Sequence, residues 1–433
     1  MPGKRLLRRC NGRTNNHLDL TKRKRLQRHN KISWAVGVKM YKAVETEEQK
    51  ETNNGGHDAE TERENTDDVY DANGGQAEHS SGIAKADADQ SPEFLDKYTV
   101  IGTLPSGSFG KIFVCTPRET NDDHKETAEL QNEHSVPRNR RFVAKRVLTR
   151  SNIETFLNNE ITVLLFMKHE NILNVEEVIR SSVYTYMVTK KYDHDLYSFM
   201  YDGVLQWKDR PLLRQTRSIM KQILCGVQYM HTHNLIHRDI KLENVFVNDT
   251  GKVVIGDLGT VVAFKQPRTA HNYGWVGTVT TNSPEMLAGD QYCEITDIWS
   301  CGLIMLDMLS NEVMPLNGNT KHPEKQLRKL IKALSVCDEE FPDPPCKLFN
   351  YIDAVRYTHT PLSVPPMIRR MDLPMDFEYP LAKMLTFDWH RRPSATEVLA
   401  MSLFSSNLSE DRSTFWGVES GAYNLSSWKP RYD

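Results

Sequence analysis

The chain lacks any apolar run long enough to cross a membrane, and it lacks paired cysteines. Its best candidate for a span, Cys301 to Leu309, is short and is broken by Asp307, whereas a spanning helix needs about 20 apolar residues. None of the seven cysteines forms a C-x-x-C pair, which argues against structural zinc and against a disulfide framework. The basic N-terminal residues lead into no apolar stretch, so we expect no secretory signal. These absences predict an intracellular protein without a membrane span.

Charge is unevenly distributed along a chain whose formal net charge is only −2. Residues 1–30 hold ten Lys or Arg and a single acid, whereas residues 45–96 hold sixteen Asp or Glu and three basic residues. Neither block has enough apolar side chains to offset the conformational entropy lost on folding. We therefore predict that residues 1–93 are disordered, first basic and then acidic, and that one folded domain follows over 94–405.

The terminal regions carry two features that suggest interactions. The cluster Lys22-Arg23-Lys24-Arg25 is a candidate nuclear import signal, and a solvated basic tail that binds any acidic surface is the alternative. The C-terminal tail, 406–433, contains several aromatic residues and would dock either on the folded domain or on a partner. No motif indicates specific recognition of a nucleic acid.

The most informative stretch runs from His237 to Asn244 and is followed by Asp257-Leu258-Gly259. The first segment matches the pattern H-R-D-x-K-x-x-N, and the second resembles D-F-G with leucine in place of phenylalanine. In protein kinases with these motifs, the first aspartate receives the proton of the attacking hydroxyl, and the asparagine and second aspartate hold magnesium. The pattern predicts Asp239 as a catalytic residue and Asn244 and Asp257 as magnesium ligands. A pattern of this length and spacing seldom arises in an ordinary charged loop.

The residues between the two motifs predict a β-hairpin. The apolar runs Val245-Phe246-Val247 and Val253-Val254-Ile255 flank the turn-forming Asn248-Asp249-Thr250-Gly251. Such a hairpin would bring the catalytic and metal-binding residues around one point, as the positioning of a phosphoryl group requires.

A glycine-containing turn lies near the start of the expected domain. Strands are expected at 98–101 and 111–114. The turn between them resembles G-x-G-x-x-G-x-V, whose backbone approaches the phosphates of ATP. Pro105 stands at the first glycine position and Ile112 replaces the valine, and a plain β-turn is the alternative. As an ATP-binding loop it comprises Leu104, Pro105, Ser106, Gly107, Ser108, Phe109, Gly110, Lys111 and Ile112.

Lys145 ends the next apolar run, Phe142-Val143-Ala144-Lys145. After a glycine loop, such a lysine resembles the one that contacts the α- and β-phosphates of ATP. Its carboxylate partner is expected on the following helix, where apolar residues recur at helical spacing from Leu157 to Leu164. Glu160 borders this apolar face and is favoured. Glu154, at the start of the helix, is the competing candidate.

A strand over 183–189 leads into a candidate hinge between two lobes. Lys191 would line the ATP site there. Asp195 would either reach a ribose hydroxyl or cap the helix that begins at Leu196. A long amphipathic helix follows, with an apolar face from Ile219 to Met230, and it leads into the catalytic loop.

Several residues downstream of the metal-binding turn are expected to hold the domain together or to contact substrate. Asp297 begins an apolar helix and is assigned a structural role. Arg392 is placed where it would pair with Glu285, and losing one partner of such a buried pair costs several kcal/mol. Thr278 is expected to contact substrate, and Thr269 and Thr278 are also candidates for activating phosphorylation.

The chain from about 94 to 405 resembles the eukaryotic-type protein kinases, and among them the serine/threonine kinases encoded in the unique short region of alphaherpesvirus genomes. The proline-containing glycine loop, the hinge around Lys191 and Asp195, and the run from Gly277 to Ala288 carry the second resemblance. The resemblance implies an α+β, two-lobed kinase fold, with ATP and Mg²⁺ between the lobes. A small β-rich lobe with one main helix would span about 94–189, and a larger helical lobe about 193–405.

Residue roles and partners also follow from the resemblance. By motif position, Lys145 and Glu160 would hold the ATP phosphates. Asp239 would orient the acceptor hydroxyl, and Lys241 would stabilise the transferred phosphoryl group. Glu243, two residues further on, would bind an arginine that precedes the acceptor, with a solvated loop acid as the alternative. The family acts on host and viral proteins, which implies effects on cell survival, the cytoskeleton and nuclear egress, in host cytoplasm and nucleus.

Two alternatives compete with an active serine/threonine protein kinase. A pseudokinase scaffold would most simply have lost the lysine, the catalytic aspartate, the asparagine or the metal-binding aspartate, and all four are present. A small-molecule kinase of related fold would lack the peptide-docking segment between Gly277 and Glu285. Lys241 favours serine or threonine over tyrosine acceptors by resemblance, so we expect a serine/threonine protein kinase.

Overall fold

The structure is a computed structural model and describes residues 90–104, 110–118, 140–149, 152–201, 213–310, 316, 320–336 and 364–405. The predicted disorder of residues 1–89, the Lys22–Arg25 cluster, the tip of the glycine loop and the aromatic tail lie outside these residues. Their predictions therefore stay predictions.

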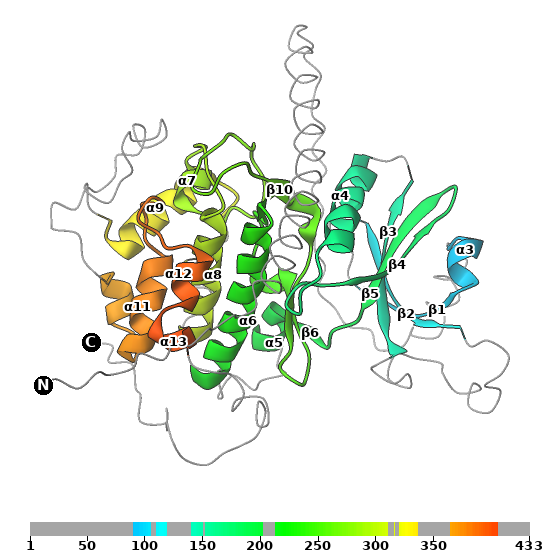
Figure 1. The fold of residues 1–433 in the computed structure, drawn as a ribbon, viewed down its shortest axis with the longest axis horizontal. Helices are drawn as coiled ribbons and strands as arrows, with labels where there is room; N and C mark the ends of the chain where they lie inside the picture. Colours follow the sequence, from blue (N-terminus) through cyan, green and yellow to red (C-terminus); the bar gives the residue numbers. More distant parts are fainter. Residues whose placement is uncertain are drawn as a thin grey trace, which may run out of the picture.

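A five-stranded antiparallel sheet forms the small lobe (Figure 1), with the strand order β1-β2-β3-β5-β4. Its strands are β1 (Tyr98–Leu104), β2 (Lys111–Pro117), β3 (Phe142–Leu148), β4 (Val175–Arg180) and β5 (Tyr184–Lys190). Helix α4 (Asn152–Phe166) packs on this sheet, and its Leu157, Ile161 and Leu164 share a buried cluster with Val147 and Met187. The apolar spacing that predicted the helix is therefore the spacing of its buried face.

The folded part of the chain begins by Gln90, four residues before the predicted boundary at residue 94. Gln90 and Ser91 are buried, and helix α3 (Pro92–Leu95) follows them. The ring of Phe94 stacks on Tyr186 with centroids 4.5 Å apart, and the Ser91 backbone N–H donates to the Tyr186 hydroxyl at 3.0 Å. The acidic composition around this segment predicted disorder. Composition could not show these contacts, because they are made with Tyr186 of β5, far along the chain.

Helices make up most of the large lobe (Figure 1). At its centre lies α8 (Thr296–Leu309), whose residues are all buried, as expected for a helix that is apolar around its circumference. Helix α6 (Leu213–Thr232) packs beside it. Shorter helices complete the lobe: α5 (Leu196–Tyr201), α7 (Pro284–Leu287), α9 (Pro323–Leu334), α10 (Pro366–Arg369), α11 (Met375–Met384), α12 (Ala395–Leu399) and α13 (Ser402–Ser405). None of the helices in the described part of the chain combines the length and apolar character that a bilayer crossing needs.

Short strands and 3-10 turns hold the loops at the boundary between the lobes. The predicted hairpin is confirmed, because β8 (Val245–Val247) pairs antiparallel with β9 (Val253–Ile255). β6 (His194–Asp195) extends this sheet, and β7 (Leu235–Ile236) pairs with β10 (Val262–Ala263). The turns are η4 (Leu242–Asn244) and η5 (Leu258–Thr260).

One buried apolar cluster belongs to both lobes. Leu164 of α4 and Met187 of β5 come from the small lobe, and Met230 of α6, Val254 of β9 and Leu258 of η5 come from the loops and helices below it. The two-lobed α+β fold expected from the sequence is confirmed, but its lobes share part of their core.

One strand differs from the sequence prediction, because β4 was not anticipated. Helix α4 ends at Phe166, just beyond the apolar residues from Leu157 to Leu164 that predicted it. The imidazole Nδ1 of His169 accepts a hydrogen bond from the backbone N–H of Asn171 at 3.0 Å. This local turn competes with continuation of the helix, as polar side chains often do at helix ends.

Candidate active site

Asp297, the first acid of α8, accepts hydrogen bonds from the backbone of the catalytic loop. Its two carboxylate oxygens accept the backbone N–H groups of His237 and Arg238, each at 2.9 Å, and His231 Nε2 lies 2.9 Å from the same group. Burial raises the pKa of Asp297, but the hydrogen bond and charge of His231, with those of His237, hold it below its ordinary value. The structural role predicted for Asp297 is therefore the positioning of the two residues before Asp239.

The side chain of Asp239 lies at the centre of a polar cluster made by predicted site residues. Its Oδ2 is 3.0 Å from Lys241 Nζ and 3.2 Å from Asn244 Nδ2. Its Oδ1 accepts a hydrogen bond from the Thr278 hydroxyl at 2.9 Å, and that hydroxyl accepts one from Lys241 Nζ at 2.9 Å. The segment between Gly277 and Glu285, expected to dock peptides, thus contacts the predicted catalytic aspartate directly, through the hydroxyl of Thr278.

Asn244 and Asp257 lie at the same end of the β8–β9 hairpin. The Gly256 N–H donates to the Asn244 backbone carbonyl at 2.9 Å. The Asn244 amide nitrogen donates to the Asp239 carbonyl at 2.8 Å, so its amide oxygen is the atom that could bind a metal ion. Asp257 adopts a left-handed backbone conformation, with φ of 54°. A hard, oxygen-only donor set of this kind fits magnesium.

Lys145 joins the sheet to α4 and to the metal-binding turn. Its Nζ lies 2.7 Å from Glu160 Oε2 and 3.3 Å from Asp257 Oδ1. The structure thus pairs Lys145 with Glu160, the partner favoured from helix phase. Burial lowers the pKa of Lys145, but the Glu160 and Asp257 carboxylates more than offset this and raise it above its ordinary value. The lysine is therefore a fixed positive charge.

The ends of the glycine loop have defined positions, whereas Pro105 to Phe109 lie outside the described residues. Ile112 stands opposite Lys145 in the β2–β3 register, so these side chains project from the same face of the sheet. Gly110 has φ of 111°, and a Cβ there would lie 2.3 Å from the Arg146 carbonyl oxygen. Only glycine fits this approach of the two strands.

Asp195 caps helix α5. Its Oδ1 accepts from the Ser198 backbone N–H, and its Oδ2 accepts from the Ser198 hydroxyl, both at 2.8 Å. The helix cap expected from the sequence is therefore present, and the contact with a ribose hydroxyl stays a prediction. Lys191 follows β5, and its Nζ donates to the Tyr192 carbonyl at 3.4 Å.

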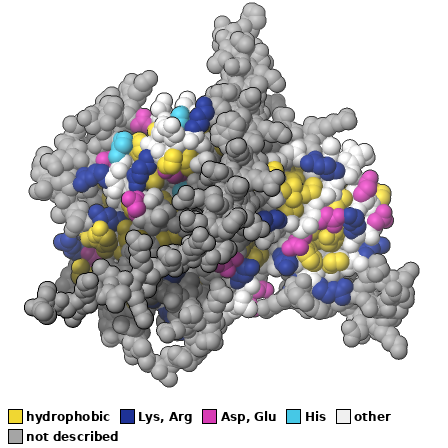
Figure 2. All heavy atoms as spheres, viewed as in Figure 1, with side chains coloured by type: hydrophobic (Ala, Val, Ile, Leu, Met, Phe, Trp, Pro, Cys, Tyr) yellow, Lys and Arg dark blue, Asp and Glu magenta, His cyan; other side chains and the backbone are white. Residues whose placement is uncertain are grey.

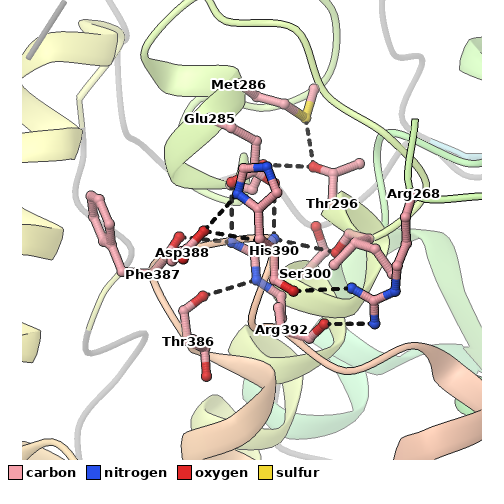
Figure 3. A network of polar contacts seen from close by, with 12 residues as sticks. Arg268, Glu285, Met286, Thr296, Ser300, Thr386, Phe387, Asp388, His390 and Arg392 are labelled. Atoms are coloured by element: carbon pink, nitrogen blue, oxygen red, sulfur yellow. Dashed lines mark hydrogen bonds and ion pairs between the residues drawn. The ribbon is translucent and has the colours of Figure 1, made fainter. Parts of the chain in front are cut away.

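Glu285 and Arg392 form a buried bidentate ion pair below the docking segment (Figure 3). Arg392 Nη1 lies 2.8 Å from Glu285 Oε1, and Nη2 lies 3.0 Å from Oε2. The same guanidinium donates to the carbonyls of Thr386, Phe387 and Ile295. The pairing expected from the sequence therefore ties α7 to the segment before α12.

Two residues without an expected role interact with residues of this region. Asp307 lies in α8, is buried, and has its pKa raised to about 8, chiefly by burial and then by the charge of Glu243. Tyr292 is buried, and its hydroxyl contacts Arg238 of the catalytic loop. An acid among the apolar residues in the second half of α8 was a usable signal for Asp307. No local signal marks Tyr292, because its contacts are long-range.

Charges of both signs are mixed on the described surface that faces the viewer in Figure 2. Lys and Arg alternate with Asp and Glu around apolar patches on the small lobe. This face shows no basic stripe of the kind that nucleic acids bind.

Comparison with known proteins agrees with this geometry. Residues 98–404 match the family model described as protein kinase domain. A "Protein kinase US3 homolog" of Psittacid herpesvirus 1 is 67% identical over 351 residues, which cover 81% of this chain and 70% of that protein. The "Serine/threonine-protein kinase US3 homolog" of Gallid herpesvirus 2 is 35% identical over 315 residues, 71% of each chain. That of Equine herpesvirus 1 (strain Ab4p) is 33% identical over 317 residues, 71% of this chain and 75% of the other. The chain therefore belongs to the protein kinase family, as a serine/threonine kinase of the alphaherpesvirus US3 type.

Proposed function

We propose that this kinase transfers the γ-phosphate of ATP to serine or threonine residues that follow arginines in host and viral proteins. The observation that carries the arginine preference is Glu243, an exposed acid in η4 between Lys241 and Asn244. The charge of Glu243 also contributes to the raised pKa of the buried Asp307 of α8.

Two neighbouring carboxyl groups suit a guanidinium better than any neutral side chain. A carboxylate binds the planar fork of arginine through two parallel hydrogen bonds, which lysine cannot reproduce. An arriving arginine would also favour the ionised form of Asp307, because an opposite charge lowers the pKa of an acid. The bound arginine would therefore lower the pKa of Asp307, and its affinity should rise with pH as that carboxyl becomes ionised.

The residues around Asp239 support a direct transfer to the acceptor hydroxyl. Asp239 would orient this hydroxyl and receive its proton, and Lys241 would stabilise the transferred phosphoryl group. Lys145, held by Glu160, would bind the α- and β-phosphates. Asn244 and Asp257 would hold Mg²⁺, which, when bound, neutralises charge on the β- and γ-phosphates.

Peptide kinetics test the arginine preference. The peptides contain one serine and place a single arginine at each upstream position in turn. For the preferred position, the wild type should show a kcat/KM at least about tenfold above that for an arginine-free peptide. Glu243→Ala and Asp307→Asn should each reduce this ratio. Glu93→Ala, an exposed acid on α3 in the small lobe, is the matched control and should keep it. Equal rates with and without arginine in the wild type would disprove the preference and leave the kinase activity intact.

The proposal extends to location, since the host cytoplasm and nucleus are where such substrates occur. The Lys22–Arg25 cluster would act as a nuclear import signal, although it lies outside the described residues. Deleting residues 21–28 should lower the nuclear fraction of the protein in transfected cells. An unchanged fraction would leave the cluster as a general binder of acidic surfaces.

A further inference from the structure

The side chain of Arg238 lies between the catalytic loop and the activation segment, the stretch from Asp257 to Glu285. Its Nε donates to the Thr260 carbonyl at 2.7 Å. Its Nη1 donates to the Tyr273 carbonyl at 3.0 Å and to the Tyr292 hydroxyl at 3.2 Å. Three of the five N–H groups of this guanidinium therefore have protein acceptors, and two of these acceptors belong to the activation segment itself.

Tyr292 closes this contact from the other side. Its hydroxyl accepts from Arg238 and donates to the Gly274 carbonyl at 3.1 Å. Its backbone exchanges two hydrogen bonds with His271, at 3.0 and 3.1 Å, in an antiparallel bridge. Burial raises the pKa of Tyr292 above its ordinary value, so the hydroxyl keeps the proton it donates. One residue thus joins the catalytic loop to residues 271–274.

A second contact holds the segment further upstream. The backbone N–H of Arg268 lies 3.0 and 3.1 Å from the two carboxylate oxygens of Glu294. The side chain of Arg268 reaches the Arg392 carbonyl and Glu397, each at 3.0 Å, as Figure 3 shows in part. These acceptors of Arg268 are thus carboxylates and a carbonyl of the protein itself.

Three threonine hydroxyls of the activation segment also donate hydrogen bonds within the site. Thr260 donates to the His237 carbonyl, Thr278 donates to Asp239, and Thr281 donates to the Thr278 carbonyl. A phosphate added to any of these would break a hydrogen bond that shapes the site. Phosphorylation activates a segment when it supplies acceptor oxygens to an arginine that otherwise lacks them. Arg238 already has such acceptors.

We propose that Tyr292 is a positioning residue that takes the place of an activating phosphate, so that the unphosphorylated activation segment is competent for catalysis. This inference rests on the proposed kinase function and adds how that function is regulated. The Tyr292 hydroxyl gives Arg238 its acceptor and fixes Gly274, three residues before Gly277. Gly277 in turn lies against the Arg238 carbonyl, where a Cβ would approach to 2.5 Å.

The first test uses the full-length wild-type kinase before and after treatment with a broad-specificity phosphatase that is then removed. Mass spectrometry of the peptides covering 257–285 verifies that this segment carries no phosphate. Initial rates on an arginine-containing serine peptide, taken before the enzyme can modify itself, should agree within about twofold. Activity that is lost on treatment and returns after incubation with ATP would overturn the inference while supporting the kinase function. Absence of activity in the untreated enzyme would instead count against the proposed function.

The second test removes only the hydroxyl, in Tyr292→Phe. Loss of a hydrogen bond to a charged group should lower kcat/KM for the peptide about tenfold or more, while KM for ATP stays within twofold. A general folding defect would lower the fraction of active enzyme and the thermal midpoint without this split. Tyr379→Phe, on an exposed tyrosine of α11, is the matched control and should match the wild type. Full peptide activity in a folded Tyr292→Phe enzyme would overturn the positioning role.

Discussion

Replacing Arg392 by methionine tests whether the buried ion pair stabilises the large lobe. All five N–H groups of the guanidinium have an acceptor: two oxygens of Glu285 and the carbonyls of Thr386, Phe387 and Ile295. Methionine fills a similar volume but offers no donor. The variant therefore leaves a buried carboxylate and three carbonyls without the bonds they have now.

The expected cost is large because one partner of a buried pair remains behind. Such losses destabilise by about 3–5 kcal/mol. For a domain of this size each kcal/mol lowers the thermal midpoint by roughly 2 °C, so we expect Arg392→Met to unfold about 6–10 °C below the wild type. Replacing Glu285 by methionine as well removes the stranded charge, so the double variant should recover part of the loss.

Differential scanning calorimetry on the full chain measures this effect. The matched control is Arg328→Met, which breaks the exposed i,i+4 pair between Arg328 and Glu324 on α9. Surface pairs contribute about 0–1 kcal/mol, so the control should move the midpoint by at most about 2 °C. If Arg392→Met unfolded within 2 °C of the control, the buried pair would not be the stabilising contact inferred from its geometry.

Three further predictions concern the active site. Asp239→Asn should lower the phosphotransfer rate about 10²–10⁴-fold with little change in the dissociation constant of ATP, and near wild-type turnover would contradict its assignment. Lys145→Met should abolish most activity and Glu160→Gln should reduce it less, measured as kcat on one peptide; the reverse order would contradict the pairing. KM for an arginine-containing peptide should fall as pH rises through about 8, because the Asp307 carboxyl, protonated below that pKa, becomes ionised. Asp307→Asn should flatten this profile, and an equally steep profile in that variant would refute the assignment. The effect of Asp307 on folding stability runs the opposite way: because its folded pKa lies above the ordinary 3.8, its neutral form stabilises the fold fully below about pH 4, and this contribution is lost as pH rises through about 8.

The parts of the site that the sequence predicted are those built from neighbouring residues. The catalytic loop and the metal-binding turn are joined by a short hairpin, so spacing alone placed Asn244 close to Asp257. Helix phase selected Glu160 over Glu154 because the helix has one buried face. The pattern could not decide between a cap and a ligand at Asp195, since both roles need the same carboxylate at the start of a helix.

The parts that were missed depend on contacts between distant segments. Tyr292 reaches Arg238 across more than fifty positions of the chain, and Asp307 meets Glu243 across a similar interval. The sequence placed the start of the domain at residue 94 and missed the buried Gln90 and Ser91, because their burial depends on Tyr186 in β5. Composition and local spacing carry no information on contacts between distant segments, which become visible only in the folded structure.

The apolar cluster shared by the lobes has a consequence for drug-screening experiments. A fragment ending at the hinge would leave Leu164 and Met187 without Met230, Val254 and Leu258, so the small lobe is not an independent cooperative unit. Heating should therefore melt both lobes in one calorimetric transition. A ligand in the nucleotide site stabilises the native state by mass action. Its affinity should then appear as a shift of that single transition, which makes melting temperature a sufficient readout for ranking inhibitors of this kinase.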